Sequence, residues 1–323
     1  SLSLTASDLV LGTSSSVTSG TAGTTLLTAL SGTTIGLGGG AGTFSVTNAE
    51  LGQITAGNLT VGNATNGTIT VDGVSFSSSP LTLVASSGAS AVNFSSTASS
   101  FSNLTLDAGT GGVDFGANVS TSGNMSVTSG GTIIDTGILT IGGTSSFTTD
   151  VANQAITLDS TSNAFTGAVS LNTSGTGDAT LASNSSVTLS TSTVGRDLNV
   201  TVGGDNSLNV TGAGSAGGTI NLLADDDIIF TAAGDLNTTA NGNITVTADN
   251  DLDKNGLGGA LTMVDGTVFN AGSGILALSA DEDITLGRVE TSSSSDTAVT
   301  LTSSSGGVVD ADTALPPEFT SLG

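Results

Sequence analysis

Three short acidic segments in the C-terminal third of the chain share the pattern Ala-Asp-x-Asp followed by Ile or Leu. They begin at Ala224, Ala248 and Ala280, so the offsets between them are 24 and 32 residues. In a fold of stacked turns, these offsets would bring like charges to about 4.8 Å from one another, where they repel. Ca²⁺ prefers oxygen ligands and would relieve that repulsion. The pattern predicts a calcium site with the ligands Asp225, Asp227, Asp249, Asp251, Asp253, Asn255, Asp281 and Asp283.

The middle segment resembles the first half of a calcium-binding loop of the EF type, with Gly256 at its sixth position. The twelfth position is Thr262 instead of the bidentate Glu, although Asp265 could substitute for it. The alternative is that these carboxylates point into water at turns and keep the protein soluble. The sequence leaves both interpretations open.

The composition excludes several classes of partner. The formal net charge is −24, which repels the phosphate backbone of nucleic acids and anionic lipid headgroups. There is no apolar run near the roughly 20 residues needed to span a bilayer. Few Lys and many Ser and Thr favour an extracellular, secreted protein. The hydrophobic fraction of 36 % lies in short β-prone runs, which disfavours disorder.

A small apolar–polar–apolar unit recurs along the chain, as in Leu59-Thr-Val61, Leu81-Thr-Leu83 and Leu104-Thr-Leu106. This alternation is typical of strands with one buried face. The units recur about every 20–24 residues with turn residues between them, which indicates a solenoid of stacked coils. The sequence therefore predicts an all-β protein, a parallel β-helix of about 14 coils. A β-sandwich is the alternative fold, but it would have to hold too many strands.

One segment departs from the strand pattern. Residues 46–74 read VTNAELGQITAGNLTVGNATNGTITVDGV, and Thr47 with Glu50 forms a capping box that predicts a helical turn from Asn48 to Gln53. This segment resembles the filamentous-haemagglutinin class of large repetitive bacterial exoproteins, as do residues 218–310. The resemblance implies a right-handed parallel β-helix, secretion and no catalytic residues. We expect one continuous solenoid over residues 1–312, with acidic coils at 218–310, and a Pro-containing terminal linker at 313–323.

We considered four functions for a chain of this kind. Paired carboxylates could hydrolyse a polysaccharide, but three basic residues and no His, Trp or Tyr make an enzyme the weaker hypothesis. Ice binding needs regular paired Thr arrays, which are not evident. We expect a non-enzymatic structural or adhesive rod, within a longer surface fibre or stacked head-to-tail with copies of itself. The competing function is a calcium-dependent module that binds glycans of a host or neighbouring cell.

Overall fold

The computed structural model describes residues 1–251 and 259–312, and its elements are nearly all β-strands. The chain divides into two compact units, unit 1 (Ser1–Thr180) and unit 2 (Leu181–Gly323). Strand β23 (Ala179–Ser183) crosses the boundary between them. The single continuous solenoid expected over 1–312 stays a prediction, and the expected linker at 313–323 lies outside the described residues.

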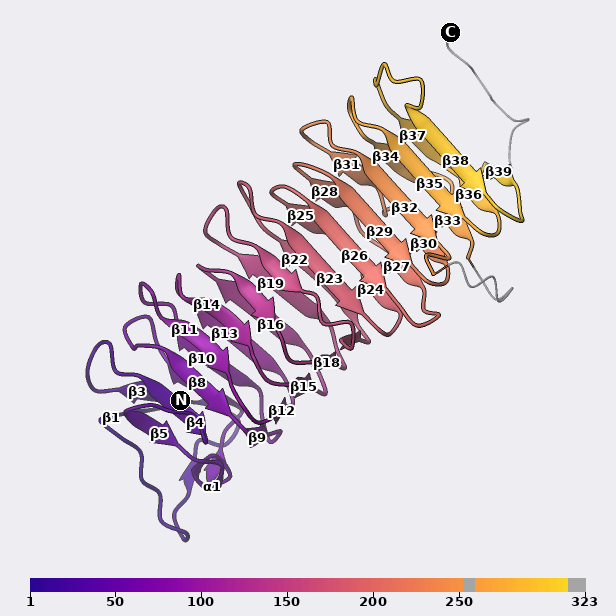
Figure 1. Ribbon diagram of the computed structural model, residues 1–323. Helices are drawn as coiled ribbons and strands as arrows, with labels where there is room; N and C mark the ends of the chain where they lie inside the picture. Colours follow the sequence, from indigo (N-terminus) through magenta and orange to yellow (C-terminus); the bar gives the residue numbers. More distant parts are fainter. Residues whose placement is uncertain (252–258, 313–323) are drawn as a thin grey trace. The chain divides into compact units, whose positions relative to one another are not determined.

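Unit 1 contains three ladders of parallel strands (Figure 1). The first ladder pairs β1 (Leu2–Ala6), β3 (Gly23–Thr28), β7 (Asn58–Gly62), β10 (Leu81–Ala85), β13 (Leu104–Ala108), β16 (Met125–Ser129), β19 (Ser145–Thr149) and β22 (Ala168–Asn172). The second pairs β5 (Phe44–Val46), β4 (Ile35–Gly38), β8 (Ile69–Asp72), β11 (Ala91–Phe94), β14 (Gly112–Phe115), β17 (Ile133–Asp135) and β20 (Ile156–Leu158). The third pairs β9 (Ser75–Phe76), β12 (Ser99–Phe101), β15 (Val119–Thr121), β18 (Leu139–Ile141) and β21 (Ala164–Phe165).

Unit 2 repeats this arrangement with three ladders of its own. The first pairs β26 (Leu198–Val202), β29 (Ile220–Ala224), β32 (Ile244–Ala248), β35 (Leu276–Ala280) and β38 (Val299–Ser303). The second pairs β24 (Val187–Leu189), β27 (Leu208–Val210), β30 (Ile228–Phe230), β33 (Leu261–Met263), β36 (Ile284–Leu286) and β39 (Val308–Asp310). The third pairs β25 (Ser192–Val194), β28 (Gly214–Ala216), β31 (Leu236–Thr238), β34 (Val268–Asn270) and β37 (Arg288–Glu290).

Alternation along each strand builds the core of each unit. In β10, Leu81 and Leu83 are buried, whereas Thr82 between them is partly exposed. The same alternation in register on the next coil makes a continuous apolar column, because successive side chains of a strand point to opposite faces. Aromatic rings also align, and Phe94 stacks on Phe115 with 5.2 Å between ring centroids. The prediction of an all-β parallel solenoid of about 14 coils is confirmed.

The solvent face of the first ladder of unit 1 is a column of hydroxyls. Register places Ser or Thr beside Ser or Thr on all eight strands of this ladder, at Ser3, Thr25, Thr60, Thr82, Thr105, Ser126, Ser146 and Ser170. The parallel column two residues further along is mixed, since Val84 and Asp107 interrupt it. This face therefore carries a single row of hydroxyls instead of a paired Thr array.

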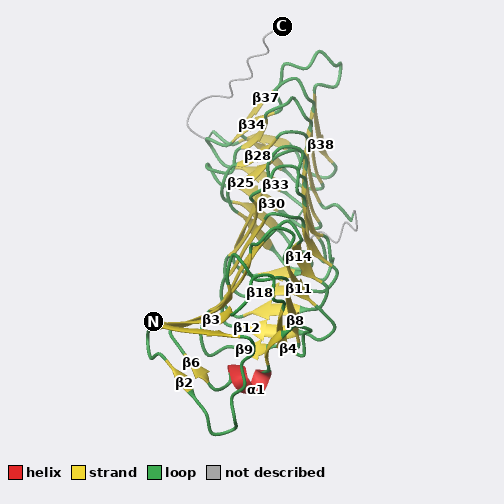
Figure 2. Cartoon of the chain, turned by 90° about the vertical axis from the view of Figure 1, so that its left-hand side faces the viewer, coloured by secondary structure: helices red, strands yellow, loops and turns green. Residues whose placement is uncertain are grey.

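The helical turn predicted within residues 46–74 is present, but it ends at Leu51 instead of Gln53. Helix α1 (Asn48–Leu51) follows β5 and lies near β9 (Figure 2). Thr47 caps it, and both hydrogen bonds of the capping box are present. Next to it, β6 (Ile54–Thr55) pairs with β2 (Val17–Thr18) in a small parallel sheet. Within the described residues, no helix is long and apolar enough to cross a membrane.

Candidate functional site at the acidic turns

The three acidic segments occupy the same turn on successive coils of unit 2. Ala224 pairs with Ala248 in the β29–β32 ladder, so Asp225 and Asp249 begin corresponding turns. Thr247 pairs with Ser279 in the β32–β35 ladder, which places Asp281 at the same position of the next coil. The stacking predicted from the offsets in the sequence is therefore correct.

Several of these carboxylates accept hydrogen bonds from the backbone of a neighbouring coil. Asp225 Oδ2 accepts from the Gly204 N–H at 2.8 Å, and Asp227 Oδ1 accepts from the Ala260 N–H at 2.9 Å. Asp283 Oδ1 accepts from the Gly307 N–H at 2.8 Å. Since a charged acceptor strengthens a hydrogen bond, each carboxylate fastens one coil to the next.

Gly259 packs closely against both Asp249 and Asp281. A Cβ atom at Gly259 would lie 2.9 Å from Asp249 Cβ and 3.4 Å from Asp281 Cβ, and its φ of +93° also favours glycine. Asp249 is buried, with a φ of 56°. Asp281 Oδ2 accepts a 3.2 Å hydrogen bond from Ser305 Oγ, while its Oδ1 is buried without a hydrogen-bond partner in the described part of the chain.

The predicted calcium ligands are thus only partly brought together. Asp253 and Asn255 lie outside the described residues, and Asp251 is exposed at the edge of that gap. Over 1–251 and 259–312, there is no group of three or more His, Cys, Asp or Glu placed to hold a metal ion. Calcium binding stays a prediction.

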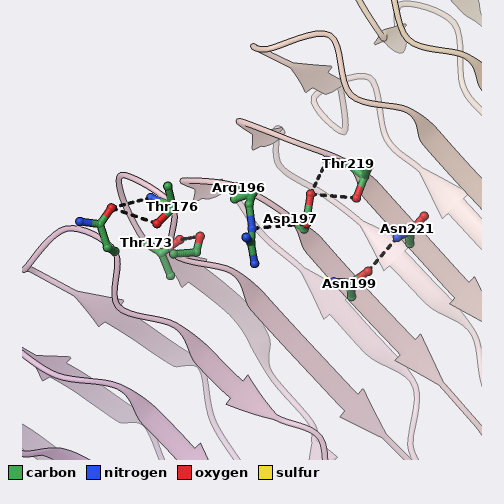
Figure 3. A network of polar contacts seen from close by, with 9 residues as sticks. Thr173, Thr176, Arg196, Asp197, Asn199, Thr219 and Asn221 are labelled. Atoms are coloured by element: carbon green, nitrogen blue, oxygen red, sulfur yellow. Dashed lines mark hydrogen bonds and ion pairs between the residues drawn. The ribbon is translucent and has the colours of Figure 1, made fainter.

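The same use of turn side chains recurs throughout unit 2 and unit 1. In unit 2, Asp197 Oδ1 accepts from the Thr219 N–H at 2.7 Å (Figure 3). Within the strands, a side-chain bond adds to this contact between coils, because Asn221 Nδ2 of β29 donates to Asn199 Oδ1 of β26 at 2.8 Å. In unit 1, Asn124 Oδ1 accepts from the Thr144 N–H at 2.9 Å. Acceptance of backbone N–H groups by turn oxygens is therefore a general device of this solenoid, and the acidic turns share it.

A second polar cluster, which the sequence analysis missed, lies inside unit 1. Asp135 stands at a core-facing position of β17, where it pairs with the buried Phe115. Its Oδ2 accepts from Asn163 Nδ2 at 2.6 Å, and its Oδ1 accepts from the Asp159 N–H at 3.0 Å. Asn163 Oδ1 in turn accepts from the Leu139 N–H at 2.7 Å. The sequence signal that could have revealed this cluster is an Asp at a position of the strand pattern that is otherwise apolar.

Burial governs the electrostatics of this cluster. It raises the pKa of Asp135 above its ordinary value, although hydrogen bonds from Asn163 and from the Ser160 and Asp159 N–H groups oppose the shift. Burial also raises the pKa of Asp114 on β14. Both pKa values are raised because burial removes water from the carboxylate and so penalises its charged form.

A hollow of about 430 Å³ lies near the end of unit 2. Asp265, Arg288 and Asp310 are among its lining residues, and the Arg288 guanidinium forms an ion pair with Glu290. The suggested substitute ligand Asp265 therefore faces this hollow, and the residues of the acidic turns do not line it.

A family described as repeats of unknown function (DUF5649) matches residues 101–172. That range contains β13 to β22, with Asp135 and Asn163 among its residues. No curated protein and no solved structure matches the chain. The match is consistent with a repetitive β-solenoid protein, and the description of the family names no activity.

Proposed function

We propose that this protein is a non-enzymatic extracellular rod that forms part of a bacterial surface fibre of the filamentous-haemagglutinin type. The observation that carries this proposal is the use of turn side chains, including carboxylates, to fasten successive coils. Asp227 and Asp283 are the clearest cases, because each accepts a backbone N–H from the adjacent coil. Polar groups used in this way are engaged in coil stacking, as a structural protein requires.

Composition supports the same proposal. Unit 1 holds nine of the 27 acidic residues and none of the three basic ones. The solvent face of its first ladder instead carries a row of hydroxyls that includes Thr82, Thr105 and Ser126. Uncharged and acidic surfaces of this kind suit a protein that lies in water outside the cell and repels anionic lipid.

Immunogold electron microscopy of intact producing cells tests the proposal. Antibodies raised against the purified chain should label filaments or material outside the cell envelope, and cells that lack the gene give the background. Labelling confined to the cell interior after permeabilisation would contradict an extracellular role.

A second function, a calcium-dependent module that binds glycans, is favoured by one observation. Asp249 and Asp281 both pack against Gly259, and Asp281 Oδ1 is buried without a hydrogen-bond partner in the described part. A cation from the solvent would complete such an arrangement. Isothermal titration of the chain with Ca²⁺, with Asp281→Asn as the comparison, tests it: no heat of binding at millimolar Ca²⁺ would exclude the module.

A further inference from the structure

Asparagine followed by glycine occurs three times in the chain, at Asn66, Asn241 and Asn255. In this pair, the backbone nitrogen of the second residue can attack the side-chain amide of the first. Glycine favours the attack because it adds no side chain beside the nitrogen and leaves the backbone free to turn. Asn255 lies outside the described residues. The other two stand in turns between strands, and their surroundings differ in two respects that govern this reaction: exposure to water and the state of the attacking N–H group.

Asn66, in the turn between β7 and β8, is protected from this reaction. It is fully buried, and the Gly67 N–H donates to the Thr33 carbonyl at 2.9 Å. Asn66 Nδ2 donates to the Gly67 carbonyl at 2.7 Å. Attack by the Gly67 nitrogen must first break the hydrogen bond to Thr33, at a buried position where the lost bond is not replaced by water. The structure therefore disfavours the reaction at this pair.

Asn241, in the turn between β31 and β32, is exposed and has a φ of 64°. The Gly242 N–H has no hydrogen-bond acceptor among the described residues. The side-chain carbonyl is held in place, since Asn241 Oδ1 accepts from the Ser273 N–H of the next coil at 3.0 Å. This donor would stabilise the negative charge that develops on Oδ1 when a nucleophile attacks Cγ. A free nucleophile, a polarised amide and water therefore meet at this turn.

Asn153 in unit 1 gives a matched comparison. It is exposed with a φ of 69°, and its Oδ1 accepts from the Thr176 N–H of the next coil at 2.9 Å. In both turns, the carbonyl of the following residue accepts a hydrogen bond from a Thr hydroxyl. The turns differ at that following residue, which is Gln154 after Asn153 and Gly242 after Asn241. A side chain at this position crowds the attacking nitrogen, so only the turn in unit 2 combines an open amide with glycine.

Gly242 is also required by the packing of the coils. A Cβ atom at this position would clash with the carbonyl oxygen of Gly218 on the preceding coil. The reactive pair therefore arises from two structural needs, a glycine that fits against one coil and an Asn that accepts a hydrogen bond from the other.

We propose that Asn241 is a site of spontaneous deamidation, and that the product loosens this coil as the protein ages. This inference is independent of the proposed role in a fibre. The Gly242 nitrogen gives its proton to hydroxide and bonds to Cγ, while the Cγ–Nδ2 bond breaks and Nδ2 leaves as ammonia with a proton from water. A water molecule then opens the cyclic imide at either carbonyl, which leaves aspartate or isoaspartate at position 241.

The isoaspartate product does not fit this turn. It lengthens the backbone by an additional atom, whereas the Gly242 carbonyl packs so closely on the next coil that a Cβ atom at Gly274 would clash with it. The product therefore displaces Gly242 and breaks the hydrogen bond from the Ser273 N–H.

Peptide mass spectrometry of the purified full chain, incubated at neutral and at alkaline pH, tests the proposal. In the folded protein, Asn241 should deamidate at least about tenfold faster than Asn66 or Asn153. The rate at Asn241 should rise with pH, because the attacking nitrogen must lose a proton. The variant Gln154→Gly places glycine after Asn153 and should bring the rate there close to that of Asn241.

Incubation in urea separates the effect of the fold from that of the sequence. Asn66 should then react as fast as Asn241, because its hydrogen bonds are lost, while Asn153 should remain slow. Equal rates at Asn241 and Asn66 in the folded protein would overturn the proposal, as would a rate at Asn241 that is far lower in the folded protein than in urea.

Amide exchange tests the effect of the modification on the coil. The deamidated fraction carries an extra negative charge and can be separated by ion exchange. In that fraction, exchange at Ser273 should accelerate while exchange at Thr176, in the matched turn of unit 1, is unchanged. Equal exchange at Ser273 in the two fractions would overturn the loosening of the coil.

Discussion

Asp135 of unit 1 and Asp227 of unit 2 both accept backbone hydrogen bonds across coils, but only Asp135 is buried, at 4 % exposure. Burial changes how much an Asp side chain contributes to the stability of the fold. Asp135 has lost its contact with water and depends on its protein donors, whereas water can replace Asp227 if the side chain is removed. We therefore expect that the burial of a carboxylate that joins two coils, more than the number of its hydrogen bonds, sets its effect on stability.

The largest expected effect is at the buried site. Asp135→Ala removes the acceptor for Asn163 Nδ2 and for the N–H groups of Asp159 and Ser160. We expect it to lower the free energy of unfolding by about 3 kcal/mol, because buried donors lose their partner. Urea denaturation measures the change. Asp150→Ala, an exposed position of unit 1, is the control, and equal losses in both variants would contradict the distinction.

The change in stability with pH that Asp135 causes should be smaller than the effect of Asp135→Ala, and the raised pKa gives its sign. The pKa of Asp135 is raised above 3.8 in the folded protein, so its contribution to stability is complete below that pH. It is lost as the pH rises through the raised pKa, because folding then buries a charge. The stability advantage of the wild type over Asp135→Asn should thus be greater at about pH 3.5 than at about pH 7. Urea denaturation at both pH values checks this, and an advantage that grew with pH would show the opposite shift.

At the partly exposed turn, the change should be modest. Asp227→Ala should cost about 1 kcal/mol, since one hydrogen bond is lost and water can solvate the Ala260 N–H. Asp227→Asn keeps the acceptor oxygen and should remain near the wild type. If Asp227→Ala lowered the free energy of unfolding as much as Asp135→Ala does, the distinction between the two environments would be wrong.

Calcium should have the smallest effect if the acidic turns serve only to fasten coils. Thermal melting with millimolar Ca²⁺ and with a chelator should then coincide. Specific binding at a hundredfold excess over the dissociation constant would instead stabilise the fold by about 2.7 kcal/mol. A shift of that kind that Asp251→Asn abolishes would establish the calcium module in place of the structural role.

The sequence predicted those features that depend on local pattern and constant spacing. The capping box of Thr47 and Glu50 predicted the helical turn that forms α1. The repeat of Ala-Asp turns predicted the stacking of Asp225 on Asp249 correctly. It did not predict the contacts of Asp8 with Ser45 or of Asp135 with Asn163. Each contact joins a strand residue to a residue of an irregular segment, 37 and 28 positions apart, where the period of the coils fixes no register. The pairing of β4 with β5 departs from the repeat and has no equivalent among the other described strands from which it could be inferred.

Amide hydrogen exchange at Ala260 and Gly307 tests most directly whether turn carboxylates fasten successive coils. Asp227→Ala should accelerate exchange at Ala260 about fivefold and leave Gly307 unchanged, since a cost of about 1 kcal/mol corresponds to a factor of about five. Asp283→Ala should do the reverse, and both Asn variants should retain protection. If exchange at Ala260 and Gly307 is the same in the wild type and all four variants, the carboxylates do not hold the coils together and the account is wrong.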